Sequence, residues 1–206
     1  MSPLGPGLAD RARETAVRLP RLLTAGVLVV LTVLAGSWLD RVNGPGNGDD
    51  RPFVVTGRTG ETVDARKLDV AVLGMRGGAV ITSYHKPVDT AGVWLLVRIR
   101  VTPRSESGGL GWARLTDGRG RRFNLTGRVD QPMTVTTSQP GLPIEGELVF
   151  EVPRDVMGPI SVQLAFPPID QRMDAVAEVE LPELTAATVA GWVATTAPLT
   201  LAGTPS

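Results

Sequence analysis

An uncharged run of 18 residues, from Leu22 to Leu39, places the strongest constraint on how this chain can fold. As a helix the run is about 27 Å long at ~1.5 Å per residue, close to the thickness of a bilayer's hydrocarbon core. A buried helix of a soluble protein would carry a polar stripe, whereas this run has only scattered Thr and Ser hydroxyls that can bond back to the helix. We therefore expect residues 22–39 to be a transmembrane helix in contact with the lipid bilayer.

Charges on either side of this run predict its orientation. The segment 11–21 holds four arginines, whereas three aspartates occur from Asp40 to Asp50. Positively charged flanks stay in the cytoplasm, so residues 1–21 are expected to be a basic cytoplasmic tail. The charges thus predict a single-pass plasma-membrane protein with a signal anchor, an N-terminus in the cytoplasm and a C-terminal domain outside.

A cleaved signal peptide is the alternative to an anchor. Ala35, Gly36 and Ser37 place small residues where a signal peptidase cuts, which would release a secreted protein beginning near Ser37. The apolar run continues through Trp38 and Leu39, beyond that site, and is long for the apolar region of a signal peptide. These features favour the uncleaved anchor.

Composition removes several classes of function. The chain has no cysteine, which excludes disulfides, thiol nucleophiles, cysteine-ligated zinc and the lipidated cysteine of a bacterial lipoprotein. Its 21 basic residues balance its 21 acidic residues, so no overall field attracts nucleic acid. A length of 206 residues leaves room for one ordinary domain beside the anchor.

The residues after the anchor divide into a linker and a β-rich domain. Residues 40–52 are rich in Gly, Pro and Asp and predict a flexible linker. The segment from Val93 to Val101 is the strongest strand candidate, because one face is wholly β-branched or leucine. Further alternating segments and a turn are expected at 68–72, 148–152, 160–166 and Asp117–Gly120. The spacing predicts an all-β fold, an antiparallel immunoglobulin-like β-sandwich over residues 53–181.

The last part of the chain carries weaker signals. Residues 175–179 alternate and predict an added edge strand. Residues 182–206 are rich in Ala and Thr and are interpreted as a loosely held C-terminal tail, with a short helix from Leu184 to Ala194 as the alternative.

The order of these segments resembles a known family. Gly60–Val63 resembles its opening, Val93–Val101 its long central strand, Leu115–Phe123 its hairpin and Pro140–Pro153 its closing strand. The family is that of the telokin-like extracytoplasmic domains of Gram-positive and actinobacterial surface proteins, which are immunoglobulin-like and of unknown function. The resemblance covers about residues 56–166.

This sequence departs from the family pattern in two respects. Pro103–Gly111 stands where members usually carry an Asn-rich turn, and the lipoprotein cysteine of many members is missing. The resemblance implies a fold and an extracytoplasmic address, and it brings no catalytic residues.

The sequence contains no phosphate-binding loop, no nucleophile elbow and no metalloprotease helix. The single histidine, His85, lacks evident partners for a triad or a zinc site. Glycoside hydrolysis requires a pair of carboxylates, for which Glu145 with Glu147, or Asp69 with Glu61, are the candidates. Glu145 and Glu147 flank the entry to a strand and are interpreted as charges on an exposed face. No catalytic, metal-ligating or cofactor-binding residue is expected.

A cluster of arginines is the one candidate site. Between Arg114 and Arg128 the only acid is Asp117, and two more arginines follow Trp94 on one face of the central strand. If the hairpin lies beside that strand, the guanidiniums would form a basic surface for carboxylates or phosphates. The alternative is that arginines keep exposed strand edges soluble. The candidate ligand surface comprises Trp94, Arg98, Arg100, Arg114, Arg119, Arg121, Arg122 and Arg128.

These observations predict a membrane-tethered, non-enzymatic interaction module. Its partner would be a membrane or envelope protein, an anionic polymer or lipid headgroups. A second hypothesis is an accessory subunit of a transport or secretion complex whose helix packs on the partner. The secreted form is a third hypothesis, and a hydrolase with an unrecognised site is a fourth.

Overall fold

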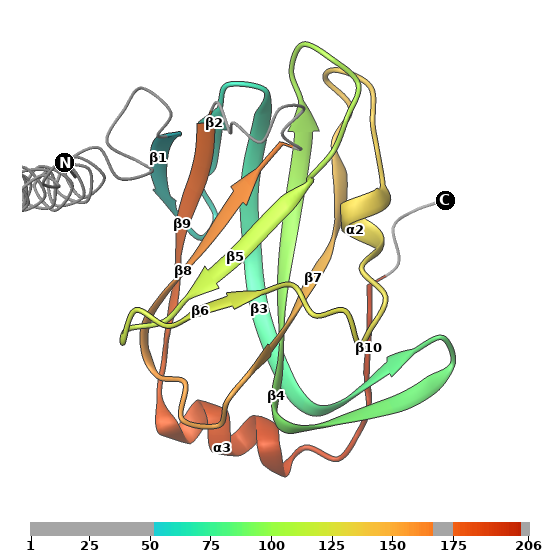
Figure 1. Cartoon of the computed structure of the whole chain (residues 1–206), viewed down its shortest axis with the longest axis vertical. Coiled ribbons are helices and arrows are strands. Elements are labelled where there is room, and N and C mark those ends of the chain that lie inside the picture. Colours follow the sequence, from blue (N-terminus) through green and yellow to red (C-terminus); the bar gives the residue numbers. More distant parts are fainter. Residues whose placement is uncertain (1–51, 167–174, 203–206) are drawn as a thin grey trace, which may run out of the picture. The chain divides into compact units, whose positions relative to one another are not determined.

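The structure is a computed structural model that describes residues 52–166 and 175–202 (Figure 1). The cytoplasmic tail and transmembrane helix predicted at residues 1–21 and 22–39, and nearly all of the linker, lie outside the described residues. Within the described ranges, no helix is both long enough and apolar enough to cross a membrane.

The described residues form two sheets and two short helices. Sheet A has the strand order β1-β9-β8-β5-β6, and sheet B has the order β10-β3-β4-β7 with β2 added beside β3. The elements in chain order are β1 (Phe53–Arg58), β2 (Thr62–Ala65), β3 (Leu68–Ser83), β4 (Lys86–Pro103), β5 (Trp112–Thr116), β6 (Arg122–Asn124), α2 (Pro132–Val135), β7 (Ile144–Val152), β8 (Gly158–Ala165), β9 (Ala175–Leu184), α3 (Ala186–Ala194) and β10 (Leu199–Thr200).

The two sheets pack face to face, which confirms the predicted all-β sandwich (Figure 1). One face of β4 forms the centre of the core, and the side chains from Val93 to Val101 on that face are fully buried. They pack against inward residues of sheet A such as Leu115 and Val162. A strand with one wholly apolar face has to place that face in the core, which is why this segment could be predicted.

The prediction of a wholly antiparallel sandwich is corrected by two strand pairs. β1 pairs with β9 in parallel, and β10 pairs with β3 in parallel. Tight turns force neighbouring strands to run antiparallel, but these two strands join the sheets from distant parts of the chain. The segment expected at 175–179 as an edge strand is also corrected, because β9 lies between β1 and β8.

β3 continues well beyond the segment 68–72 that alternation predicted. Its second half contains Gly77 and Gly78, and glycine weakens a strand signal. Both glycines make room for the end of the chain. A Cβ on Gly77 would overlap the ring of Trp192, and one on Gly78 would lie 2.9 Å from Leu199 Cδ1.

The expectation of a loosely held tail from residue 182 onward is wrong for the described part of that segment. β9 extends to Leu184, and the alternative helix forms as α3, which lies across one end of the sandwich (Figure 1). The hydroxyl of Thr185 caps α3 by accepting a hydrogen bond from Thr188 N at 3.1 Å. Leu184 and Val189 are buried in the core. Packing therefore holds this segment in place, although its Ala- and Thr-rich composition predicts no ordered structure.

β7 is the last strand of sheet B, and a side chain covers part of its open edge. The Gln131 amide donates to Val149 O at 2.8 Å and accepts from Val149 N at 3.1 Å. A primary amide thereby supplies the donor and the acceptor that a neighbouring strand would supply.

Candidate functional site

The outer face of sheet B, the face turned away from sheet A, carries a second apolar cluster. Ile81, Trp94, Leu96, Val129 and Val149 are buried there. The ring nitrogen of Trp94 donates to the carbonyl of Val88 at 3.0 Å. Trp94 was predicted to be part of an exposed ligand surface, and the structure corrects this: neighbouring segments of the chain cover the indole completely.

One segment that packs on this cluster is Leu199–Ala202, which we call the strap. Leu199 and Leu201 pack on the second apolar cluster, and β10 pairs with β3 at Ile81 and Thr82. The strap thus adds to sheet B beside β3 as a short strand, and its leucines pack on the second apolar cluster.

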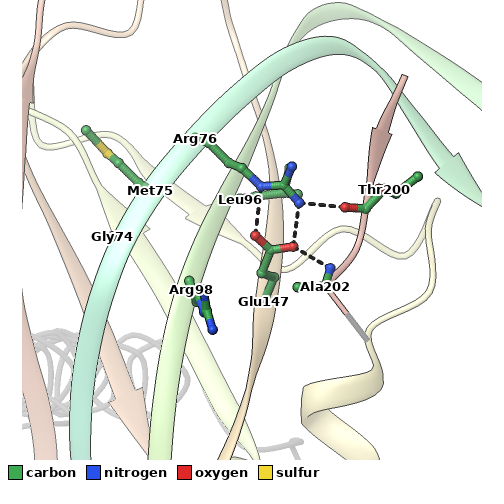
Figure 2. Close-up of a pocket in the computed structure, with 8 residues that line it drawn as sticks. All are labelled: Gly74, Met75, Arg76, Leu96, Arg98, Glu147, Thr200 and Ala202. Carbon is green, nitrogen blue, oxygen red and sulfur yellow. Dashed lines mark hydrogen bonds and ion pairs between the residues drawn. The ribbon is translucent and has the colours of Figure 1, made fainter. Parts of the chain in front are cut away.

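An ion pair with a buried carboxylate fixes the middle of the strap (Figure 2). Arg76 Nε and Nη2 donate to the two carboxylate oxygens of Glu147, each at 2.8 Å. The same Arg76 Nη2 donates to Thr200 O at 2.5 Å, and Ala202 N donates to Glu147 Oε2 at 2.9 Å. Sheet and strap are therefore joined through one bidentate pair.

Glu147 remains ionised although only 4% of its side chain is exposed. Burial by itself raises the pKa of this carboxyl. The hydrogen bonds from Arg76 and Ala202, with the positive charges of Arg76 and Arg98, outweigh burial and hold the pKa of Glu147 below its ordinary value.

Two residues before Glu147 on the same strand, Glu145 forms an exposed counterpart. Arg98 Nη2 donates to Glu145 Oε2 at 2.9 Å, and Arg100 donates to Oε1 from Nε at 2.8 Å and from Nη2 at 2.6 Å. The hydrogen bonds of Arg100, then those of Arg98, lower the pKa of Glu145. The two arginines share one carboxylate, so a positive charge is left over at this place.

A cavity of about 460 Å³ opens beside these charges (Figure 2). Leu96 and Met75 contribute its apolar lining, Arg76, Arg98 and Glu147 its charged lining, and the strap residues Thr200 and Ala202 border it. A volume of this size is within the range of ligand sites in proteins, roughly 300–1,000 Å³.

The hairpin arginines lie elsewhere, on sheet A, because β5 pairs with β6 and β8 and not with β4. Asp117 accepts from the backbone N–H groups of Arg119 and Arg121 and from Arg121 Nε at 2.8 Å. Arg119 and Arg121 also pair with Asp155, at 2.6 and 2.9 Å, and so tie the hairpin to the loop before β8.

The pKa values of these carboxyls follow from the same contacts. For Asp117, burial raises the pKa, but the hydrogen bonds from Arg121 and Arg119 outweigh it, and the net shift is downward. For Asp155, the hydrogen bonds of Arg121 lower the pKa first, followed by those of Arg119. This cluster serves to hold the hairpin in place.

The remaining candidates divide between the two sheets. Arg114 stacks on the Trp112 ring with its guanidinium carbon 4.8 Å from the centroid, and Arg122 is exposed on β6. Arg128 lies on the sheet B side, pairs with Glu151 at 2.6 Å and covers the Trp94 ring. The predicted arginines therefore form two separate groups, and the condition for one joint basic surface is not met.

The residues considered for catalysis lie in a turn or bond to neighbouring side chains and backbone. Tyr84 and His85 form the two-residue turn between β3 and β4, with φ of 48° and 62°. Glu61 accepts from Arg58 N, and Asp69 faces Arg104. Within residues 52–166 and 175–202, no group of three or more His, Cys, Asp or Glu side chains is placed to hold a metal ion.

Sequence reasoning missed Arg76, the role of Glu147 and the strap. The signal for Arg76 was hidden in the glycine-rich second half of β3. A charged residue directly before a Gly-Gly pair carries no periodic pattern that would identify it as part of a strand.

No family model matches the chain, and no curated protein matches it. Solved structures similar in fold include an uncharacterised β-sandwich protein of Clostridium difficile, with 11% identity, a TM-score of 0.41 and coverage of 66% of this chain and 98% of that one. A predicted lipoprotein, YcdA of Bacillus subtilis, has 12% identity, a TM-score of 0.46 and coverage of 65% and 41%. The secreted protein MPT63 of Mycobacterium tuberculosis has 13% identity, a TM-score of 0.43 and coverage of 62% and 99%. At this level the likeness bears on no function, and the fold class rests on the chain's own two sheets.

Proposed function

We propose that the protein is a membrane-tethered, extracytoplasmic binding module without enzymatic activity, which contacts a partner protein through the outer face of sheet B. The observation that carries the proposal is the cavity of about 460 Å³, whose lining combines Leu96 with the charged groups of Arg98 and Glu147. Protein interfaces combine an apolar centre with a polar rim and are enriched in arginine. A tether at residues 22–39 would raise the effective concentration of the domain near membrane partners.

The carboxylates beside the cavity support a role without catalysis. Glycoside hydrolysis needs one carboxylic acid with a raised pKa. The pKa values of Glu145 and Glu147 are both lowered, and arginine hydrogen bonds occupy their oxygens. Neither group suits proton donation near neutral pH.

We also propose the finer classification of the domain as immunoglobulin-like and telokin-like. The long strand β4, the β5–β6 hairpin and the closing strand β7 follow one another along the chain in the order that the resemblance implies.

A second candidate ligand is an anionic envelope polymer or lipid headgroup. The group around the cavity contains three arginines, Arg76, Arg98 and Arg100, against Glu145 and Glu147, so one positive charge is in excess. Most of this charge is compensated internally, which favours a protein over a polyanion.

Site-directed photo-cross-linking in the native membrane tests the proposal. A photoreactive residue at Thr102, on β4 next to Arg100, is expected to yield an adduct of defined mass, and one at Asn124 on sheet A is expected to yield none. Replacing Arg98 and Arg100 by Ala should reduce the adduct several-fold, whereas Arg122→Ala serves as the matched control.

Two outcomes would contradict the proposal. Equal adducts at Thr102 and Asn124 would remove the outer face of sheet B as the contact surface. An absent adduct together with salt-dependent binding to anionic vesicles would replace the partner protein with the second candidate.

Scrambling residues 22–39 while keeping them apolar separates the binding module from the accessory subunit, because only the subunit needs specific side chains there.

A further inference from the structure

The strap holds its place with few contacts. Its pairing with β3 involves two residues, Leu199 and Thr200. Thr200 and Ala202 are exposed, and Leu199 and Leu201 are only partly buried. A strand of two residues is far shorter than the usual protein strand, which has about five to six residues. Besides that pairing, the hydrogen bonds from Arg76 to Thr200 O and from Ala202 N to Glu147 hold the strap, so its attachment depends on a few groups.

The connection to the strap also permits movement. Residues 195–198 join α3 to β10, and all four are exposed. α3 is anchored independently, by Val189 in the main core and by Trp192 against Gly77. Release of the strap leaves both the helix and the inner core in place, because Leu199 and Leu201 pack on the second apolar cluster alone.

The groove that the strap occupies, formed by the second apolar cluster with Arg76 and Glu147, is continuous with an unfilled cavity. The cavity of about 460 Å³ lies between the strap residues Thr200 and Ala202 and the sheet residues Leu96 and Arg98. A structural plug would be expected to fill such a groove, because protein interiors are close-packed. The cavity therefore extends the surface beside the strap, next to the second apolar cluster on which Leu199 and Leu201 pack.

The strap defines the chemistry that the groove recognises. Two apolar side chains, two residues apart, occupy the second apolar cluster, and the carbonyl between them accepts from Arg76. The N–H that follows the second apolar residue donates to Glu147. Recognition thus uses backbone groups and an apolar-polar-apolar spacing, which is how extended peptides bind when they add to a sheet.

We infer that the strap occupies, within the chain, a binding groove for an extended peptide segment of a partner protein. The segment would displace the strap, pair with β3 at Ile81 and Thr82, and place two apolar side chains over Trp94 and Leu96. This inference rests on the proposed function and specifies how the partner is recognised.

A peptide with the sequence of the strap, Thr196 to Ala202 (TAPLTLA), is the direct probe. In the full-length protein, Leu199→Ser and Leu201→Ser are expected to release the strap by removing its apolar contacts, and we call this the released-strap variant. Fluorescence anisotropy measures binding of the labelled peptide to it. Binding to the wild type should be about tenfold weaker, because the attached strap competes at an effective concentration near millimolar. The control peptide TAPTLLA has the same composition with adjacent leucines and should not bind.

Hydrogen exchange on the unaltered protein provides a second test that does not depend on a variant folding. The amide of Ala202 should exchange through local opening, at least a hundredfold faster than the amides of Leu95 and Ile99 in β4. Equal protection of strap and β4 would mean that the strap opens only when the protein unfolds, and it would overturn the inference.

Three further outcomes separate this inference from the proposed function. If the yield of the adduct at Thr102 is the same in the wild type and in the released-strap variant, the partner protein binds without displacing the strap. That result would support the proposed function and overturn the inference about the strap. A wild-type dimer that disappears in the Leu199→Ser, Leu201→Ser variant would identify a second copy as the occupant and overturn the partner segment. No peptide binding by the released-strap variant, with its thermal unfolding still cooperative, would overturn the inference.

Discussion

Glu145 and Glu147 stand two residues apart on the same face of β7, yet they have opposite surroundings. Glu147 is covered by the strap, with 4% of its side chain exposed, and binds Arg76 and the backbone of Ala202. Glu145 is 29% exposed and bridges Arg98 and Arg100. The two glutamates point to the same side of β7, and they differ in exposure because the strap lies over Glu147 and not over Glu145. Glu147 therefore stabilises the fold, whereas Glu145 is available to a binding partner at the surface.

The largest expected effect is that of Glu147→Ala. It removes the acceptor of Arg76 Nε and of the Ala202 N–H and leaves Arg76 with its bond to Thr200 O, and we expect the free energy of unfolding to fall by about 2–3 kcal/mol. The partial exposure of Arg76, 42%, keeps the loss at the lower end for a buried pair. Urea denaturation measures the loss, with Glu145→Ala as the matched control. Equal losses in the two variants would contradict the comparison.

Acidification should separate the two glutamates next. Both have a folded-state pKa below the ordinary value of 4.5, so their contribution to stability is complete above that value and is lost as the pH falls through the folded-state pKa. Glu147→Gln should flatten the fall in stability between about pH 5 and pH 3 more than Glu145→Gln does, because solvent screens Glu145. Thermal unfolding across this range provides the measurement. A larger change for Glu145→Gln would reverse the assignment.

Arg76→Lys sharpens the comparison by keeping the charge and removing the bidentate geometry. An ammonium group cannot reproduce the two parallel bonds to Glu147 together with the bond to Thr200 O, and we expect a loss of about 1 kcal/mol. The same change should speed exchange of the Ala202 amide. Unchanged exchange would show that the ion pair does not hold the strap.

Glu145→Gln should have the smallest effect on stability, below about 0.5 kcal/mol, as is usual for exposed pairs. Its effect on binding should be larger, because it frees Arg98 and Arg100. Retention on a heparin column should shift to higher salt for this variant and not for Asn124→Ala. No shift would mean that the two arginines are inaccessible to anions.

The core of the sandwich could be predicted from the sequence because it depends on local alternation. The segment Val93–Val101 faces the core as expected, and β7 and β8 also form where alternation indicated. The hairpin at Asp117–Gly120 forms as expected, with Gly120 at φ 74° in the turn. In each case neighbouring residues alone specify the element.

The candidate site could be predicted only in part, because it depends on contacts between distant segments. No local pattern tells whether the hairpin pairs with β4 or with β8, so the arginines of two sheets were grouped together. Local alternation predicts Trp94 at the surface because residues that pack on its cluster, Leu199 and Leu201, lie more than 100 residues away in an Ala- and Thr-rich segment. Gly77 and Gly78 likewise become intelligible only when Trp192 and Leu199 are seen to occupy the space beside them.

The amide of Gln131 has a consequence for assembly of this domain at a crowded membrane. An edge strand with unpaired backbone groups can pair with the same strand of another copy, and repeated pairing leads to aggregation. At Val149 both backbone groups that such a stack would use are already bonded to Gln131. The Gln131 side chain, together with the Thr126 N–H that also donates to Val149 O at 3.3 Å, therefore blocks lateral growth of sheet B at this position.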